Sequence, residues 1–369
     1  LQKRLPCTIF VLMDELYYDA VDLLERMIAI PSVSRDENRV ADLLEWQMGQ
    51  WGLDPKRHGN NVWSIASGFD TGLPTLLLNS HIDTVKVVDG WTRDPFTPEE
   101  TEDERIYGLG SNDAGASVVS LLAAFRYLAD ADRAYNLVFL ASCEEEVSGK
   151  GGIESVLPLL PPIDAAIVGE PTSMQPATAE KGLLVLDGTV TGTSGHAARD
   201  EGENAIYNAM TVIDALRTFS PERESQLLGP LKVTVTQIEA GTQHNVVPDC
   251  CKIVVDVRTT DAYTNAETVE MLQAVAGAKC RLVPRSTRLA PSRIDASHPL
   301  VMRLVILGKR PFGSPTLSDQ ALMPFPSLKI GPGESARSHT ADEYIEKSEI
   351  RDAIQTYVTL LDGLAIKKI

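Results

Sequence analysis

TLLLNSHIDTV, residues 75–85, joins a short apolar run to polar side chains of the kind that bind metal ions. The run does not alternate apolar with polar residues, which is typical of a strand buried on both faces of a parallel sheet. Two further segments share this character, NLVFLA at 136–141 and DAAIV at 164–168. Helical spacing of apolar residues marks the segments 17–30, 37–51 and 113–128. Strands that alternate with helices predict an α/β domain whose sheet is mostly parallel.

The pattern changes from about Gly182 onward. Strands are expected in LLVLDGTVTG, KVTVTQIEAG and CKIVVDVRTT, and helices at 204–219 and 266–276. Apolar and polar residues alternate along 231–238 and 252–257, which indicates an antiparallel sheet with one solvated face. The order strand-helix-strand-strand-helix-strand predicts a small ferredoxin-like α+β unit. A chain of 369 residues is also longer than one ordinary core, so we expect two domains.

Composition and charge restrict the partners. The apolar fraction of 43% and the charged fraction of 23% are those of a soluble globular protein. Acidic residues outnumber basic ones by 51 to 34, and the formal net charge is −17. Such a chain repels the phosphates of nucleic acid and an anionic membrane surface alike. Neither nucleic acid nor a membrane is therefore expected as a partner.

The cysteines and the N-terminus bear on the cellular compartment. The five cysteines show no C-x-x-C spacing and their number is odd, which argues against a disulfide framework and favours a reducing cytosol. Lys3 and Arg4 precede a short apolar run, but this run contains Pro6 and lacks the cleavage site of a signal peptide. We interpret residues 1–12 as a disordered leader or an upstream extension before a start at Met13. No apolar stretch is long enough to span a bilayer.

Side chains suited to metal binding follow each buried run. In open α/β sheets ligands bind beyond the carboxyl ends of the strands, so these side chains are expected at one edge. The candidates, in chain order, are His81 with Asp83, the run Glu144-Glu145-Glu146, Glu170, and His339 beyond the apolar segment 327–330. The two-residue period of a strand places His81 and Asp83 on the same side, where Asp83 is suited to orient the imidazole while its other nitrogen binds metal.

Asp113 stands between glycines in GLGSNDAG, immediately before the apolar helical segment. This position predicts a helix N-cap, and the glycines allow close approach of the backbone. A carboxylate there is suited to bridge two cations, with one oxygen for each.

Each of these features also has a simpler explanation. A single H-x-D pattern arises by chance in many chains, and three adjacent glutamates suit a solvated loop. Three like charges in a crevice with little water need exposure, protonation or a cation. Ligand-type residues after successive elements, in the order His, Asp, Glu, Glu, His, are harder to assign to chance, so the combination predicts a metal site.

Several motifs in order along the chain resemble those of the M20 family of dinuclear zinc peptidases, which includes acetylornithine deacetylase, succinyl-diaminopimelate desuccinylase, aminoacylase-1 and carboxypeptidase G2. The motifs are NSHIDTV, GLGSNDAG, EEE, VGEPT, GTSGHAAR, HNVVPD and SHTADEY. The resemblance implies an α/β metallopeptidase catalytic domain of residues 1–178 and 288–369. It also implies an inserted ferredoxin-like lid and dimerisation domain of residues 179–287, through which a homodimer forms.

The resemblance also implies roles for individual residues. His81, Asp113 and Glu170 would hold one cation, and Asp113, Glu146 and His339 the other. Glu145 would be the general acid/base and Asp83 would orient His81. The family often has Asp-Glu-Glu where this chain has three glutamates, so the last two are aligned with the functional pair. The cations are expected to be Zn²⁺, although the ligands would also accept Co²⁺ or Mn²⁺.

Smaller expectations concern the substrate. In the resemblance, His196 of GTSGHAAR reaches the active site of the opposite subunit and stabilises an oxyanion, although a turn histidine that only packs is the simpler alternative. Arg258 is suited to pair with a substrate carboxylate, or else forms a salt bridge at a sheet edge. Asn245 is expected to contact substrate, although a turn before Pro248 explains it as well. Gly331 is expected to shape the pocket floor.

The activity implied is metal-dependent hydrolysis of an N-acyl amino acid, of the N-acetyl- or N-succinyl-ornithine or citrulline type, in arginine biosynthesis. Desuccinylation of succinyl-diaminopimelate in lysine biosynthesis, and carboxypeptidase or dipeptidase activity, stay open as alternatives. A non-catalytic binding protein is disfavoured because the ligands and Glu145 are present. A single-metal or cysteine-based hydrolase is disfavoured by the bridging position of Asp113 and by the lack of a Cys/His motif near Cys143, which we interpret as a packed thiol.

Overall fold

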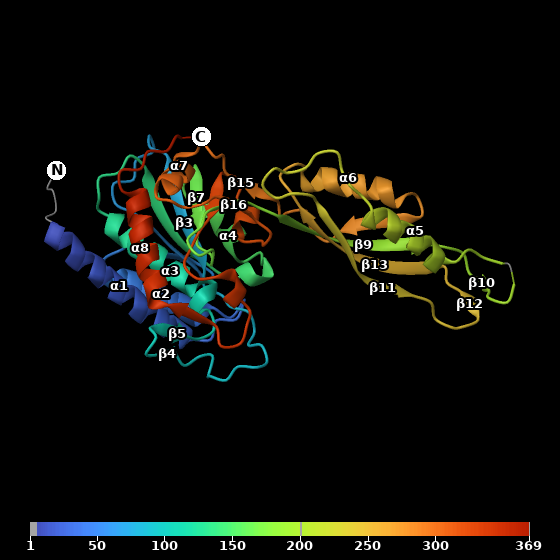
Figure 1. Ribbon diagram of the computed structural model, residues 1–369, viewed down its shortest axis with the longest axis horizontal. Helices are drawn as coiled ribbons and strands as arrows, with labels where there is room; N and C mark the ends of the chain where they lie inside the picture. Colours follow the sequence, from blue (N-terminus) through green and yellow to red (C-terminus); the bar gives the residue numbers. More distant parts are fainter. Residues whose placement is uncertain (1–5, 200, 369) are drawn as a thin grey trace. The chain divides into compact units, whose positions relative to one another are not determined.

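The computed structural model describes residues 6–199 and 201–368, with side chains described from Leu12 onward (Figure 1). The chain divides into two compact units. The first unit contains the chain up to Thr178, Ile294–Phe312 and the chain from Ser318, and the second unit contains Ala179–Arg293 and Gly313–Leu317. The interpretation of these units as a catalytic domain and a lid stays a prediction.

A nine-stranded mixed sheet forms the centre of the first unit. Its order is β1 (Lys56–His58), β2 (Asn61–Ile65), β6 (Asn136–Ser142), β3 (Thr75–His81), β7 (Ala165–Val168), β17 (Ser327–Lys329), β8 (Ala177–Glu180) and β15 (Ser292–Arg293), with β16 (Phe312–Ser314) beside β8. The neighbours β6, β3, β7 and β17 are parallel. Every residue of these four strands is buried, as the apolar runs predicted, and the α/β fold class is confirmed.

Helices cover both faces of this sheet. The helices α1 (Pro6–Ile28), α3 (Ala116–Leu128) and α8 (Lys347–Leu361) pack against one another over one face, and α2 (Asn38–Gln50) and α7 (Pro299–Ile306) contribute to the same core. The short α4 (Ile153–Val156) contributes to a smaller core on alternate residues of the strands. Because α1 already begins at Pro6, the expected disordered leader is wrong for residues 6–12, and residues 1–5 lie outside the described residues.

A small three-stranded sheet brings the chain before Asp113 beside the chain after His339. Its order is β18 (Tyr344–Glu346), β5 (Arg105–Tyr107) and β4 (Glu99–Glu100). Ile106 of β5 and Ile345 of β18 are opposite each other and fully buried, so apolar burial fixes the register.

The second unit has the predicted ferredoxin-like order of elements. These are β9 (Gly182–Thr191), α5 (Ala205–Arg217), β11 (Lys232–Ala240), β13 (Cys250–Thr259), α6 (Asn265–Ala276) and β14 (Cys280–Pro284), and the antiparallel sheet order is β11-β13-β9-β14. Alternate residues of β9 and β13 are buried in the core of this unit. Asn204 caps α5 and Thr264 caps α6 with a capping box, which explains where both helices begin.

Two further expectations concern membranes and cysteines. Within residues 6–199 and 201–368, no helix combines the length and the apolar character needed to cross a membrane. Cys143, Cys250, Cys251 and Cys280 are free thiols. Burial raises the pKa of Cys143 to about 12, which agrees with a packed thiol. Cys7 lies outside the described side chains.

Candidate metal centre

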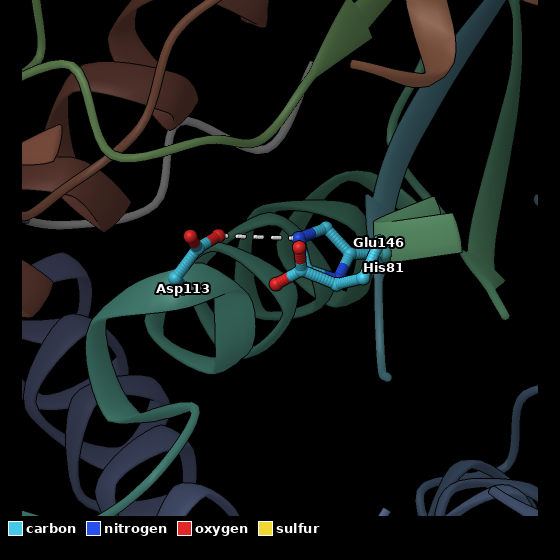
Figure 2. A group of neighbouring side chains, drawn as sticks. All are labelled: His81, Asp113 and Glu146. Atoms are coloured by element: carbon cyan, nitrogen blue, oxygen red, sulfur yellow. Dashed lines mark hydrogen bonds and ion pairs between the residues drawn. The ribbon is translucent and has the colours of Figure 1, made fainter. Parts of the chain in front are cut away.

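His81 is the last residue of β3, and its imidazole is buried at the carboxyl end of the parallel strands. Its Nδ1 lies 2.9 Å from the main-chain oxygen of Asp83. A carbonyl oxygen only accepts, so Nδ1 carries a proton; Nε2 donates to a carboxylate in the apo protein and is the nitrogen that a cation would bind after losing that proton. Nε2 lies 3.2 Å from Asp113 Oδ1 (Figure 2) and 3.8 Å from Glu170 Oε1. The ring is thus oriented as a metal-binding histidine requires.

Asp113 faces both histidines with different oxygens. Its Oδ1 approaches His81, and its Oδ2 lies 3.5 Å from His339 Nε2. The expectation that Asp113 caps a helix is wrong, because α3 begins at Ala116 with Gly115 at the N-cap. Asp113 instead lies in the single turn Ser111–Gly115 with non-helical φ and ψ angles of −120° and 95°.

The glycines around Asp113 have the predicted effect on packing. A Cβ atom on Gly115 would lie 2.5 Å from the main-chain oxygen of Gly110, so only glycine permits this turn. The turn leaves the Asp113 carboxylate at the edge of the sheet, with its two oxygens directed to different partners.

The glutamate run follows β6 and is held by Asp83. The chain turns sharply at Glu144, whose φ is +56°, and Glu145 and Glu146 then lie in a short 3-10 helix. The carboxylate of Asp83 accepts the main-chain N–H groups of Glu145 at 2.9 Å and of Glu146 at 3.1 Å, and the hydroxyl of Ser34 at 2.7 Å. It also lies 3.5 Å from His81 Nδ1. Asp83 therefore fixes the glutamates as well as the imidazole.

Glu170 and His339 complete the cluster from later segments. Glu170 follows β7, and Gly331 packs closely on the main chain of Glu170. A Cβ atom on Gly331 would lie 2.5 Å from the main-chain oxygen of Glu170. Gly331 thus contacts a site residue, although its predicted contact with substrate stays a prediction. His339 Nε2 lies 3.0 Å from Glu146 Oε2.

The predicted ligand residues therefore gather at one place. Two groups have ligand atoms within 4.8 Å of one another: His81 with Asp113 and Glu146, and His81 with Glu145 and Glu170. Neither group equals a predicted ligand set, because Glu145 lies as close to His81 as a ligand would and His339 joins through Asp113 and Glu146. Which glutamate binds metal and which transfers protons stays a prediction.

Burial and like charge make this cluster retain protons. Burial raises the pKa of Glu170 to about 8, and the charge of Asp113 raises it further. Burial also raises the pKa of Glu145 well above its usual value. Burial lowers the pKa of His81, but its hydrogen bonds to Asp113 and Asp83 raise it well above its usual range.

The exposed histidine also retains its proton, but through the opposite charge beside it and against the effect of burial. The hydrogen bond to Glu146 raises the pKa of His339 to about 9. A cluster that holds protons so firmly lacks positive charge, and divalent cations supply that charge in proteins. Imidazole nitrogens and carboxylate oxygens are also the donors that zinc and cobalt accept. The residues therefore fit a two-cation centre.

Three buried residues support this cluster without a sequence signal. Asp319 accepts hydrogen bonds from Asn79 of β3 at 3.0 Å and from Ser142 of β6 at 2.6 Å, and it ties the strands that carry His81 and the glutamates. Burial raises its pKa to about 6. The other two are Glu343, which accepts main-chain N–H groups of the turn that carries Asp113, and Asn112 of that turn, whose side chain bonds to the segment before His339.

The remaining predicted residues lie in the second unit. His196 is exposed on the two-stranded ribbon of β10 (Gly195–His196) and β12 (Val246–Val247), and its Nδ1 accepts the N–H of Ala198 at 3.1 Å. Asn245 lies beside it and accepts the N–H of Ala197 through its main-chain oxygen at 3.0 Å. Arg258 pairs with Asp256 at 3.0 Å, so the salt bridge is present, but the expected sheet edge is wrong because β13 lies between β11 and β9. The roles of these three residues stay predictions.

Comparison with known proteins agrees with the site. The chain matches peptidase family M20/M25/M40 over residues 77–363. Acetylornithine deacetylase from Proteus mirabilis (strain HI4320) is 27% identical over 381 residues, which covers 94% of this chain and 97% of that protein. A tripeptidase from Staphylococcus aureus subsp. aureus mu50 has a similar structure, with a TM-score of 0.73, 18% identity and coverage of 94% of this chain and 97% of the other.

A second solved structure is that of the Bacillus subtilis YXEP protein, a dinuclear metal-binding peptidase from the M20 family. It has a TM-score of 0.72 and 15% identity, and the similarity covers 95% of this chain and all of the other. At such identities the solved structures establish a shared fold. The family match, however, covers most of the chain and includes every ligand-type residue of the cluster. The chain therefore belongs to peptidase family M20/M25/M40 and is a metal-dependent hydrolase.

Proposed function

We propose that the protein hydrolyses the N-acyl amide bond of an acylated amino acid, of the N-acetyl- or N-succinyl-ornithine or citrulline type. The observation that carries this proposal is the position of Asp113, whose two oxygens face His81 and His339 separately. Such a bridge suits two cations, here Zn²⁺ with Co²⁺ as the alternative. Glu145 lies beside the imidazole of His81.

The residues of the chain divide the work of hydrolysis. Two bound divalent cations would lower the pKa of a water molecule and polarise the amide carbonyl. Glu145 is then placed to take the proton of the attacking water and to deliver it to the leaving amine. Burial raises the pKa of Glu145 in the apo protein, so its ionised form, which acts as the base, must first be favoured by the bound cations. Asp83 holds the main chain of Glu145 and so fixes the position of the base.

The substrate class is supported by the acetylornithine deacetylase of Proteus mirabilis, which aligns with 94% of this chain. With the sequence resemblance, it leads us to place the reaction in arginine biosynthesis. The test is a panel of N-acetyl- and N-succinyl-amino acids, succinyl-diaminopimelate, dipeptides and tripeptides, each offered to the zinc- and cobalt-loaded enzyme. We expect the highest kcat/KM for an N-acyl amino acid. Faster cleavage of a peptide with a free amino terminus would refute the deacylase proposal and leave the metal centre intact.

We also propose that the second unit forms a homodimer interface, so that His196 reaches the active site of the partner subunit. Two observations support an interface on this unit: Tyr207 and Met210 of α5 are largely exposed, and β11 is an edge strand with Ile238 exposed. Tyr207→Glu with Met210→Glu should give monomers in sedimentation, whereas Glu270→Gln on the exposed part of α6 should not. Dimers that persist in the double variant would place the interface elsewhere.

A further inference from the structure

A buried carboxylate outside the ligand cluster connects the segments that carry Asp113 and His339. Glu343 is 2% exposed, and its Oε1 accepts the main-chain N–H groups of Asn112 and Asp113, both at 2.9 Å. Glu343 follows His339 closely in the chain. One side chain thus reaches from the His339 segment to the main chain of the residue that faces both histidines.

The local fold explains why a side chain is needed here. The ladder between β18 and β5 continues for one residue, because the N–H of Gly108 donates to the main-chain oxygen of Glu343 at 3.0 Å. The chain then turns at Gly110, whose φ is +79°, and leaves the ladder. Leu109 and Ser111 donate to other main-chain oxygens, but the N–H groups of Asn112 and Asp113 would lack an acceptor, and a buried unpaired N–H is costly. The carboxylate of Glu343 takes the place of the missing strand.

Asn112 makes a second connection to the same segment. Its Oδ1 accepts the N–H of Glu334 at 3.0 Å, and its Nδ2 donates to the Glu334 oxygen at 3.1 Å and to Ser338 Oγ at 3.3 Å. Asn112 is fully buried, and a Cβ atom on Gly333 would lie 2.1 Å from its Oδ1. The loop before His339 therefore packs directly on the amide, which holds the loop from its other end.

We propose that Glu343 and Asn112 form a latch that sets the separation of Asp113 and His339, and with it the affinity of the cation position that these two residues share. The latch acts as a pair of positioning residues. The inference rests on the proposed two-cation centre but not on the substrate. His81 lies outside the latch, because β3 and the main-chain oxygen of Asp83 hold it. Loss of the latch should therefore weaken the cation position of Asp113 and His339 most, and the His81 position, which shares only Asp113 with it, much less.

Two substitutions of Glu343 separate positioning from charge. Glu343→Met fills the space but accepts no hydrogen bond, whereas Glu343→Gln keeps an oxygen where Oε1 lies. Asn112→Ala removes the other half of the latch. Glu102→Gln, an exposed glutamate in the turn before β5, is the matched control. Each apo protein is titrated with Zn²⁺ against a chromophoric chelator, and with Co²⁺ while the visible absorption of the bound ion is recorded.

Wild type and Glu102→Gln should bind two cations. Glu343→Met and Asn112→Ala should bind the second cation about 10- to 100-fold more weakly, the range typical of groups that orient metal ligands, and should weaken the first, which shares Asp113, clearly less. Glu343→Gln should recover most of the second affinity. Two cations bound normally by Glu343→Met, equal weakening of both positions, or no recovery in Glu343→Gln would each overturn the latch.

Two further outcomes have separate meanings. If Glu343→Met does not give a cooperative unfolding transition, Asn112→Ala decides by the same criteria, because it removes only the connection to the loop. If the wild-type protein binds fewer than two cations, the two-cation centre of the proposed function fails, and the latch fails with it. A wild-type protein that binds two cations but deacylates no substrate on the panel refutes only the proposed substrate.

Discussion

Asp83→Asn should destabilise the apo protein strongly, because each oxygen of this carboxylate serves two donors. Oδ1 accepts from Glu145 N–H and lies near His81 Nδ1, while Oδ2 accepts from Ser34 and from Glu146 N–H. The side-chain amide of asparagine has one oxygen, so its NH₂ group must face one of these pairs of donors. The substitution then removes either the hydrogen bond from Glu145 N–H with the 3.5 Å contact of His81 Nδ1, or the two hydrogen bonds from Ser34 and from Glu146 N–H.

The size of the loss follows from this count. At about 1.5–3 kcal/mol for each hydrogen bond to a charged group, the loss is at least about 1.5–3 kcal/mol on the Oδ1 side and about 3–6 kcal/mol on the Oδ2 side. That is a large part of the roughly 5–15 kcal/mol that stabilises a typical protein. Because the chain forms two units, the assay must be local as well as global: hydrogen exchange of the amides of Glu145 and Glu146, together with urea unfolding of the apo protein.

The control is Asp342→Asn. Asp342 also accepts two main-chain N–H groups and a hydroxyl, but at the protein surface, so water replaces the lost bonds. Its effect should be much the smaller. If Asp83→Asn shifts the unfolding free energy by less than about 1 kcal/mol and both amides stay protected, the hydrogen-bond argument is wrong.

The pH dependence of this effect has a definite sign. Burial raises the pKa of Asp83, but the hydrogen bond from His81 and its charge lower it below the usual value. A carboxyl with a lowered pKa stabilises the folded state above its unfolded pKa, and this stability is lost as pH falls through the folded pKa. The difference in unfolding free energy between wild type and Asp83→Asn should therefore be largest at neutral pH and should disappear only in acid.

Three other outcomes are expected. Glu145→Gln should keep both cations and lose about 100-fold or more in kcat, whereas Glu146→Gln should lose metal; reversed metal contents would shift the glutamate assignment by one residue. Because the pKa values of Glu170 and His339 are raised to about 8 and about 9, apo stability should fall as pH rises through these values, and a flat urea midpoint from pH 5 to 9 would contradict this. Reassociated Glu145→Ala and His196→Ala subunits should recover about a quarter of wild-type activity if His196 acts across a dimer, and none if it acts within its own subunit.

The sequence predicted the buried strands well because their signal is local. β3, β6 and β7 each begin within one residue of the apolar runs, since unbroken apolar runs suit only strands covered on both faces. The ligand-type residues gather because parallel strands end at one edge. The turn at Asp113 was missed because a carboxylate before an apolar helix is typical of an N-cap, whereas the contact with Glu343, far away in the sequence, helps to fix a non-helical turn.

The supporting carboxylates escaped prediction for a different reason. Glu343 and Asp319 contact main-chain or strand atoms more than two hundred residues away in the chain. The partners of Glu343 are main-chain N–H groups, which are the same in every residue, so no residue type marks them. The partners of Asp319 are side chains, Asn79 and Ser142, and distance in the chain hides them. The hydrogen bonds from the glutamate run to Asp83 were also missed, because the donors are the main-chain N–H groups of Glu145 and Glu146 and not their side chains.

The supporting carboxylates also explain why the apo fold and the cation must be coupled. Asp83, Asp319 and Glu343 are buried next to a cluster that is itself acidic. These supporting carboxylates therefore add negative charge that protons or cations must compensate. Without a cation, protons supply the compensation, as the raised pKa values of Glu343 and Glu170, both about 8, indicate. Cation binding must then release protons and stabilise the fold, by RT ln(1 + [L]/Kd) for each site.

Calorimetric titration of the apo protein with Zn²⁺ at pH 7, in buffers of different ionisation enthalpy, should show net proton release. An apparent enthalpy independent of the buffer would mean that the cluster is already deprotonated, and the electrostatic account of this site would then be wrong.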